Sequence, residues 1–273
     1  MVALKDVDIE EVIQSLRYDL GFLPKEALRA AIEYKEKSLP KFIEILEEDA
    51  KKIKEYEKSS YIFPFYAIFI FAYLKDSSVS SVLLKFLSSH PTIVREILGD
   101  AAEDSLAKAL ANVSYRDAEG IGNIIKNARL NSIIRKSAFA SFIVMYAQRK
   151  ISRKDLLLYS RDFLRLPHEK DPSFISRLVV ECLNIYPEEL MDDIEKLFKE
   201  NRVDLWLVSW QGVRRQMNRS KREVLGEMYE RYGKDLGDPV AELNEWYAFR
   251  ETEDLLDSDP LNGRKYENCR YYF

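Results

Sequence analysis

Glycine, proline and cysteine are all scarce in this sequence. The chain of 273 residues contains 9 glycines, 9 prolines and 2 cysteines. Because a sheet-rich protein must turn often, the shortage of glycine and proline favours long helices joined by short corners. The cysteines, Cys182 and Cys269, are too few for a disulfide framework. They predict free thiols in a reducing, cytoplasmic compartment.

An excess of positive charge is also missing, and so is a long apolar run. The formal net charge of -4 argues against a general binder of polyanions. The most apolar stretch, residues 61–74, carries no charge but is shorter than the roughly 20 residues that span a bilayer. The acidic, amphipathic N-terminus does not resemble a signal peptide. We therefore expect no membrane span and interpret residues 61–74 as a buried helix.

Catalytic and metal-binding motifs are missing too. The two histidines, His90 and His168, do not belong to an E-x-x-H or H-E-x-x-H pattern, and there is no Walker A or G-x-S-x-G motif. Gly120-x-Gly122 lacks the third glycine and the preceding strand of a dinucleotide site, so it predicts a flexible corner that opens a helix. The sequence offers no catalytic, cofactor-binding or metal-binding residue, which favours a protein without enzymatic activity.

What the sequence does contain is helical periodicity along most of its length. The apolar stretch 61–74 is followed by an amphipathic stretch, 79–87, and such a pair is typical of an inner and an outer helix. Similar pairs recur about every 35 to 40 residues, which is the range of stacked helical repeats. We predict an all-α superhelix, right-handed, built from about six antiparallel helix pairs. The later pairs are 99–113 with 117–130, 131–149 with 152–166, and 171–186 with 187–201.

The core and the end of the array can also be predicted. Phe65, Phe69, Ala72 and Tyr73 fall at helical spacing in the uncharged run and are expected to be buried. Beyond Tyr232 the sequence becomes acidic and is interrupted by glycine and proline. We therefore divide the chain into a helical-repeat domain, 1–232, and an acidic, aromatic C-terminal segment, 233–273, that docks on or extends from the last repeat.

Several long segments resemble a bacterial family known as domain of unknown function 1186. They are GFLPKEALRAAIEYKEKSLPKFIEILEE, FPFYAIFIFAYLKDSSVSSVLLKFL, and LGDAAEDSLAKALANV followed by SIIRKSAFASFIVMY. The resemblance covers roughly residues 16–232. It implies HEAT-like helical repeats, no established activity and no catalytic residue.

Some members of that family end in a zinc motif like that of SecA, of the form CPCGSGKKYKKCC. The tail DPLNGRKYENCRYYF resembles it at Gly263, at residues 264–266 and at Cys269, but lacks the two leading cysteines. A tetrahedral zinc site needs four donors, which one thiolate cannot supply. We therefore interpret the tail as a degenerate motif and predict no bound zinc.

The most unusual polar stretch is DLWLVSWQGVRRQMNRSKRE. Trp206, Trp210, Val213 and Met217 fall on one helical face, which predicts a core stripe. The basic run beside them is by default solvated, although arginine is well suited to bind carboxylate or phosphate. A second basic cluster is formed by Arg149, Lys150, Arg153 and Lys154. The candidate interaction surface consists of Trp206, Trp210, Arg214, Arg215, Arg219, Lys221 and Arg222.

Two functions fit these observations. Stacked helix pairs form extended concave surfaces that usually bind peptides or proteins, which favours a protein- or peptide-binding module. The alternative is a nucleic-acid-binding protein or a DNA glycosylase, because some HEAT-like proteins use basic and aromatic concave residues for that purpose. A continuous basic groove would favour the alternative, whereas an acidic or mixed groove favours the protein-binding module. The negative net charge makes nucleic acid the weaker prediction.

The acidic segment lies just after the basic run, and opposite charges so close in sequence meet at little cost in loop closure. We expect residues 234–259 to fold back along the last helices, and Trp246, Tyr247, Phe249 and residues 271–273 to pack on apolar surface. The segment then either caps the array or occupies a groove that a partner later takes. The alternative is a disordered acidic tail.

Overall fold

The protein was analysed as a computed structural model, and the description covers residues 7–52 and 60–246. Within these ranges all regular secondary structure is helical. The sole β pairing there is an isolated antiparallel bridge between Tyr18 and Tyr61. The prediction of an all-α protein is therefore confirmed. The α-helices are α1 (Ile9–Arg17), α2 (Lys25–Glu33), α3 (Lys35–Lys52), α4 (Phe63–Leu74), α5 (Ser80–Leu87), α6 (Pro91–Leu98), α7 (Asp104–Val113), α8 (Ala118–Lys126), α9 (Ser132–Ala147), α10 (Arg153–Leu164), α11 (Pro172–Leu183), α12 (Met191–Lys199), α13 (Trp210–Met217), α14 (Lys221–Tyr232) and α15 (Pro239–Asn244).

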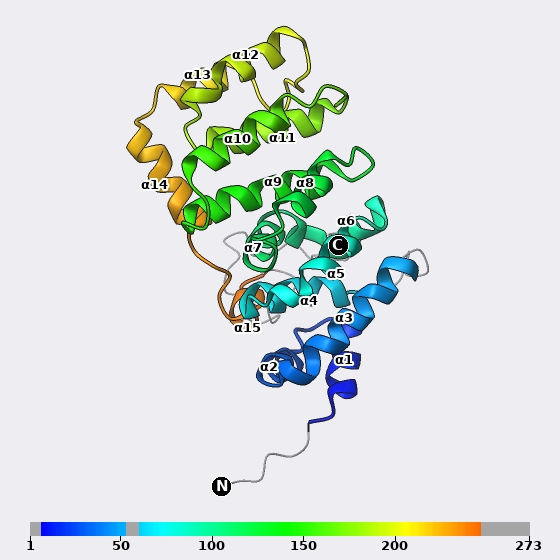
Figure 1. Cartoon of the computed structure of the whole chain (residues 1–273). Helices are drawn as coiled ribbons and strands as arrows, with labels where there is room; N and C mark the ends of the chain where they lie inside the picture. Colours follow the sequence, from blue (N-terminus) through cyan, green and yellow to red (C-terminus); the bar gives the residue numbers. More distant parts are fainter. Residues whose placement is uncertain (1–6, 53–59, 247–273) are drawn as a thin grey trace, which may run out of the picture.

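The helices from α1 to α13 follow one another along a stack (Figure 1). Helices α4, α7, α9 and α11 pack side by side in that order and form one layer. Helices α5, α8, α10 and α12 follow them in the chain. Helix α5 packs on α8, α8 and α10 pack on α9, and α10 packs on α12, so the predicted pair of α9 with α10 packs directly. Helix α6, which the sequence analysis did not single out, packs against α4 and α5.

The interior of the stack is centred on α4 and α9. All residues from Phe63 to Ala72 are buried, so α4 is covered on every side and the buried-helix interpretation of this run is confirmed. Phe65, Phe69 and Ala72 are among them, as predicted. Tyr73 was predicted wrongly, since its ring is 40% exposed. It lies in the last turn of α4, where the helix emerges from its neighbours.

Two buried cations lie on α9. The Arg135 guanidinium pairs with Glu169, donates to the carbonyl of Ile125 and lies 3.5 Å above the ring of Phe174. Lys136 lies 2.8 Å from a carboxylate oxygen of Glu103 and 3.8 Å from one of Glu181. Because buried charges need partners, these contacts fix α9 against its neighbours on both sides.

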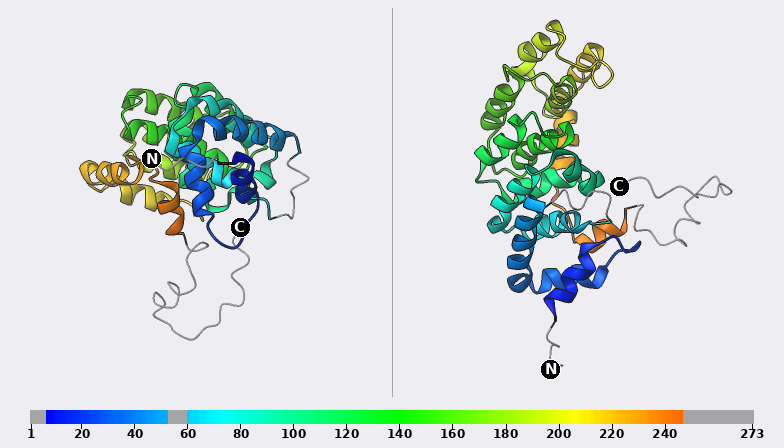
Figure 2. Two further views of the ribbon diagram at one scale, coloured as in Figure 1. Left: turned by 90° about the horizontal axis from the view of Figure 1, so that it is seen from below. Right: turned by 90° about the vertical axis from the view of Figure 1, so that its right-hand side faces the viewer.

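The C-terminal elements leave the end of the stack and return along its layer of α4, α7, α9 and α11. Helix α14 packs on α9, and α15 packs on α2 and α4. Figure 1 shows α14 and α15 on one side of the stack, and the right-hand view of Figure 2 places them on the inner side of a curved array. We call the face of α4, α7, α9 and α11 that they contact the inner face, and residues 233–246 the strap.

The path of the strap differs from the prediction in two respects. The strap does not stay on the last helices, because α15 and Trp246 reach α2 and α4 near the other end of the stack. Its first acidic residue, Asp235, also does not pair with the basic run at 214–222. Asp235 pairs instead with Lys75, which is 2.6 Å away. Trp246 does pack on apolar surface, while Tyr247, Phe249 and residues 271–273 lie outside the described residues.

Candidate interaction surface

A short loop between α12 and α13 is held firmly at its base. The backbone N–H of Asp204 donates to the Ser176 hydroxyl of α11, at 2.7 Å. The Asp204 carboxylate accepts from the N–H of Trp206 at 2.9 Å, and its backbone carbonyl accepts from Leu207 and Val208. Val208 is buried and anchors the far side of the turn. The tip of the loop therefore has a fixed shape.

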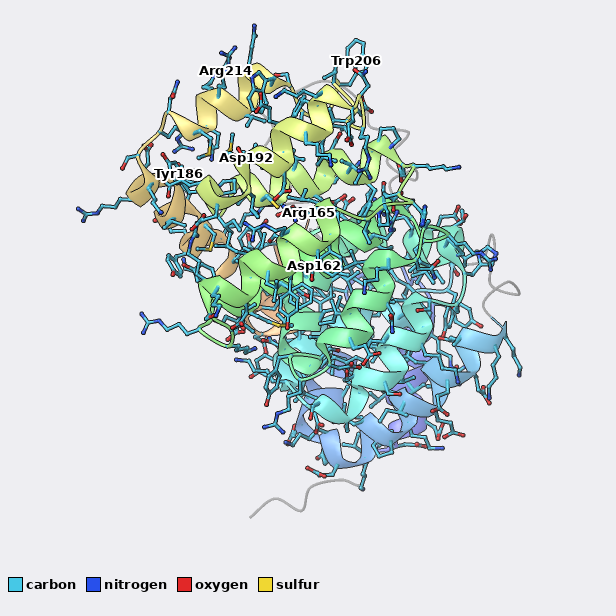
Figure 3. All side chains as sticks on the ribbon, turned by 45° about the horizontal axis from the view of Figure 1, so that its top comes forward. Asp162, Arg165, Tyr186, Asp192, Trp206 and Arg214 are labelled. Carbon is cyan, nitrogen blue, oxygen red and sulfur yellow. The ribbon has the colours of Figure 1, made fainter. Side chains whose placement is uncertain are left out.

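This tip presents three apolar side chains to solvent. Leu205 is 68% exposed, Trp206 97% and Leu207 40%. Figure 3 shows Trp206 projecting from the end of the array beyond α12. The prediction that Trp206 belongs to a core stripe is wrong, because α13 begins only at Trp210 and Trp206 lies in the preceding turn. Contiguous exposed apolar side chains tend to mark interaction sites. The exposed indole and its two leucine neighbours on this well-anchored turn therefore form a candidate site.

The rest of the predicted stripe does face the core. Trp210 packs edge-on against Phe198 of α12, with ring centroids 5.4 Å apart. Val213 is fully buried, and the carbonyl of Met217 accepts a hydrogen bond from the Tyr186 hydroxyl at 2.9 Å. Trp210 thus holds α13 in place and has little surface left for a partner.

The basic residues divide into engaged and free groups. Arg219 pairs with Glu223 and Glu227, and the hydrogen bonds that it donates, first to Glu227 and then to Glu223, raise the pKa of its guanidinium. Lys221 pairs with Glu188. In contrast, Arg214 and Arg215 are exposed and form no ion pair with any other described residue. Because α13 packs through its opposite face, both guanidinium groups are presented to solvent, and Figure 3 shows Arg214 at the same end of the array as Trp206.

The second basic cluster is largely engaged in holding the fold. Lys150 donates to the carbonyl of Ala111 and to the side chain of Asn112, and burial lowers its pKa. Arg153 donates to the carbonyls of Ile185 and Tyr186 and pairs with Glu189 at 2.9 Å. These cations neutralise helix ends and loops, so they do not form a free basic groove.

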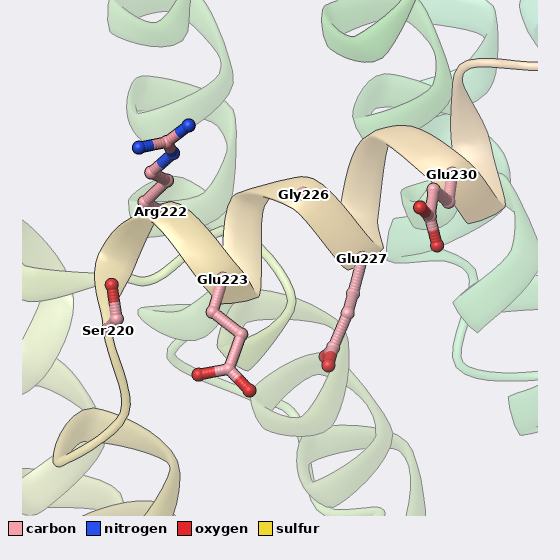
Figure 4. Close-up of a pocket in the computed structure, with 6 residues that line it drawn as sticks. All are labelled: Ser220, Arg222, Glu223, Gly226, Glu227 and Glu230. Carbon is pink, nitrogen blue, oxygen red and sulfur yellow. The ribbon is translucent and has the colours of Figure 1, made fainter.

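A hollow of about 440 Å³ lies beside α14 (Figure 4). All of its lining residues lie on α14 or at its N-cap, so a single helix cannot enclose a ligand there. The remaining basic residue of the candidate surface, Arg222, lines this hollow together with three glutamates. The charge on this side of the molecule is therefore mixed. The lining residues are Ser220, Arg222, Glu223, Gly226, Glu227 and Glu230.

The described residues contain little that could hold a metal or perform chemistry. Within 7–52 and 60–246, no three His, Cys, Asp or Glu side chains lie close enough to share a metal ion. Burial raises the pKa of the Cys182 thiol well above its usual range, which makes it a poor nucleophile. Gly120 does open a helix as predicted, but it is tightly packed, because a Cβ there would lie 2.7 Å from Leu84.

Two further observations bear on the predicted tail and on membranes. The segment that resembles a zinc motif lies outside the described residues, so the absence of zinc stays a prediction. Among the helices of the described ranges, none has the length and apolar character that crossing a membrane requires.

The structure keeps three residues of the candidate surface and adds two that the sequence analysis missed, which gives five. Leu205 and Leu207 join Trp206, Arg214 and Arg215 as the exposed apolar and unpaired basic groups at the end of the array. The signal for the leucines was present in DLWLV, where an aspartate that can close a turn precedes four apolar residues. We call these five residues the Trp206 surface.

Comparisons with known proteins give relatives without an assigned function. A family model described as "Protein of unknown function (DUF1186)" matches residues 7–250. An uncharacterized protein of Chlamydia muridarum is 29% identical over 209 residues, which is 76% of this chain and 84% of the relative. An uncharacterized protein of Chlamydia trachomatis serovar D is 28% identical over the same length, covering 76% and 83%. No solved structure matches significantly.

Proposed function

Because the chain belongs to the DUF1186 family of proteins of unknown function, we propose its function from its own geometry: it is a helical-repeat scaffold that binds another protein or a peptide. The observation that carries the proposal is the 97% exposed Trp206 on a loop whose base is fixed by Asp204 and Ser176. The proposal has four further parts. The fold is a HEAT-like α-α superhelix, and the helical-repeat domain ends near Gly233. The protein has no catalytic activity, and it is located in the cytoplasm.

The chemistry of the Trp206 surface indicates the kind of partner. Tryptophan and arginine are the residue types most enriched among those that dominate binding energy at protein interfaces. The loop is ordered before binding, which reduces the entropy lost on association. Arg214 and Arg215 offer guanidinium groups that suit carboxylates. The partner we propose presents an apolar pocket or side chain with acidic residues beside it.

The nucleic-acid alternative has less support. Such binding draws on a basic face that neutralises phosphates. Lys150 and Arg153 of the second basic cluster are engaged in the fold, and the charged residues beside α14 include Glu223, Glu227 and Glu230. This mixed charge supports a protein partner over nucleic acid.

The proposal is tested by comparing partners of matched variants. Proteins captured by the wild-type chain are identified by mass spectrometry, purified and titrated against each variant. We expect Trp206→Ala to weaken binding by about tenfold or more, the range of a dominant interface residue, without lowering the melting temperature. Leu158→Ala is the control, because Leu158 is also an exposed apolar residue, 54% accessible, but lies on α10.

Two results would contradict the proposal. One is a purified partner whose affinity is the same for the wild type, Trp206→Ala and the double variant Arg214→Glu, Arg215→Glu. The other is a chain that captures nucleic acid with an affinity that falls steeply with salt, which would establish the alternative.

A further inference from the structure

The strap is held on the inner face by a clamp for one carboxylate. Asp235 accepts from Lys75 at 2.6 Å through one oxygen and from Gln148 at 2.7 Å through the other. Lys75 is the C-cap of α4 and Gln148 the C-cap of α9. The ends of two inner helices on either side of α7, 73 residues apart in sequence from 75 to 148, thus converge on a single acidic side chain.

The clamp works against the helix dipoles. The C-terminal end of a helix carries partial negative charge and disfavours a carboxylate. Burial also raises the pKa of Asp235, but the hydrogen bonds from Lys75 and Asn112 outweigh it and lower the pKa below its usual value. Lys150, which covers the end of α7, adds further positive charge nearby. The inner face is therefore equipped to bind a carboxylate at a place where helix ends alone would repel one.

The strap also covers apolar side chains of the inner face next to this clamp. Leu236, Val240 and Leu243 are buried, and Trp246 packs edge-on against Phe65 and Phe69 with ring centroids 5.5 and 5.4 Å apart. Val240 and Leu243 lie three residues apart on one face of α15, and Leu236 and Trp246 lie just before and just after this helix. The other face is exposed at Ala241 and Glu245. The strap thus has the pattern of an amphipathic peptide in a groove.

The strap can separate from the array without disturbing the helix before it. Helix α14 is fixed by Tyr232, which is buried and donates to Glu181 at 2.6 Å. Helix α15 has six residues, far fewer than an isolated helix needs to be stable in water. The Lys75–Asp235 pair is 49% and 38% exposed at its two side chains, and such pairs contribute little to stability. Opening of the strap therefore requires less free energy than unfolding of the array.

We propose that the inner face is a peptide-binding groove that the strap occupies as a tethered ligand. Its external occupant is a segment of a partner protein that carries a carboxylate followed by apolar residues at the spacing of Leu236, Val240, Leu243 and Trp246. Lys75 and Gln148 bind the carboxylate, and Phe65 and Phe69 bind the last apolar side chain. This site is separate from the Trp206 surface and does not depend on it.

The test compares peptide binding to the wild type and to a full-length release variant, Leu243→Asp with Trp246→Ala. Both changes lie in the strap, so the clamp and the groove keep their residues. The probe is a fluorescent peptide of residues 233–246, titrated by anisotropy. In the wild type, the tethered strap competes at a millimolar effective concentration. We expect the release variant to bind the peptide at least about tenfold more tightly than the wild type.

Charge exchange provides the matched controls. In the release variant, a peptide with Asp235→Lys should bind at least about tenfold more weakly, as expected for a lost hydrogen-bonded charge pair. A further Lys75→Glu change in the protein should restore part of that loss for the altered peptide. Adding Trp206→Ala to the release variant should leave peptide affinity unchanged. The proposal of a peptide-binding groove and the proposal of the Trp206 surface are therefore tested independently.

Hydrogen exchange of the wild-type chain gives a second measurement that needs no variant. We expect the amides of 239–246 to exchange together and faster than the core of α9. The proposal is overturned if the strap amides exchange only as slowly as those of α9, or if the release variant unfolds, because the strap would then be an integral part of the fold. It is equally overturned if the release variant stays folded and binds the peptide no more tightly than the wild type does.

Discussion

Phe69 and Tyr73 lie one turn apart on α4 and have opposite surroundings. Phe69 is 1% exposed and contacts both Phe65 and Trp246, so it belongs to the core and to the groove under the strap. Tyr73 reaches solvent in the last turn of the same helix. This pair makes it possible to separate the effect of burial from the effect of helix propensity, because both are aromatic residues in one helix.

We expect Phe69→Ala to lower the free energy of unfolding by about 3 to 5 kcal/mol, the usual range for truncating a buried phenylalanine. Tyr73→Ala should lower it by less than about 1 kcal/mol, since its ring is half exposed. Urea denaturation of the two variants measures both values. If both variants lose the same free energy of unfolding, Phe69 is not more deeply buried than Tyr73 and the description of α4 is wrong.

At this scale the sequence predicted interior residues well and residues at helix ends poorly. Periodicity identified Phe65, Phe69 and Val213 because each lies within a helix that neighbours cover. It placed Trp206 wrongly, because the turn that exposes it depends on a hydrogen bond from Asp204 to Ser176 of another helix. That partner is 28 residues away, and no local pattern can reveal it.

Among the elements, the strap is expected to dock in a pH-dependent way. The pKa of Asp235 is lowered in the folded chain, so its contribution is fully present above the unfolded value of about 3.9 and is lost as pH falls through the lower folded value. The window in which the strap weakens therefore lies below about pH 4.

We expect the indole N–H signal of Trp246 in an NMR titration to move toward its value in a free peptide as pH falls through this window. Protonation of Asp235 removes the charge that Lys75 binds, so the strap opens more often and the ring spends less time against Phe65 and Phe69. In Asp235→Asn the signal should not depend on pH in this range. A wild-type signal that stays constant down to the acid unfolding of the array would contradict the role given to the clamp.

The elements themselves were predicted to different degrees. The pair α9 and α10 was predicted from its apolar pattern, and Ser152 with Asp155 forms the capping box that starts α10. Helix α6 was not singled out, since it has only eight residues, Pro91–Leu98, and is followed directly by a 3-10 turn. The route of the strap was beyond prediction, because its partners Lys75 and Gln148 become neighbours only after the array has formed.

Over the whole molecule, the helices in the middle of the stack have neighbours on both sides and the outer ones do not. Helix α7 packs between α4 and α9, and α9 packs between α7 and α11 and beneath α14. In an array of this kind, stability comes mainly from contacts between successive units. Local opening should therefore be easiest at the ends.

We expect amide exchange to be slowest in α7 and α9 and to become faster toward α1 at one end and α13 at the other. Native-state hydrogen exchange at several low concentrations of denaturant measures this gradient. If all helices exchange at one rate with the same dependence on denaturant, the chain unfolds in a single step and the description as an array of units is wrong.

The strap also has a mechanical consequence. One end of it is held beside α11 by the bond between Tyr232 and Glu181, and the other end is held at α4 by Trp246. Helical arrays flex through small rotations between successive units. Straightening the curve would stretch the strap, so a docked strap stiffens the array. A chain whose strap has been displaced is free to change its curvature, and the spacing of any proteins bound along it would change as well.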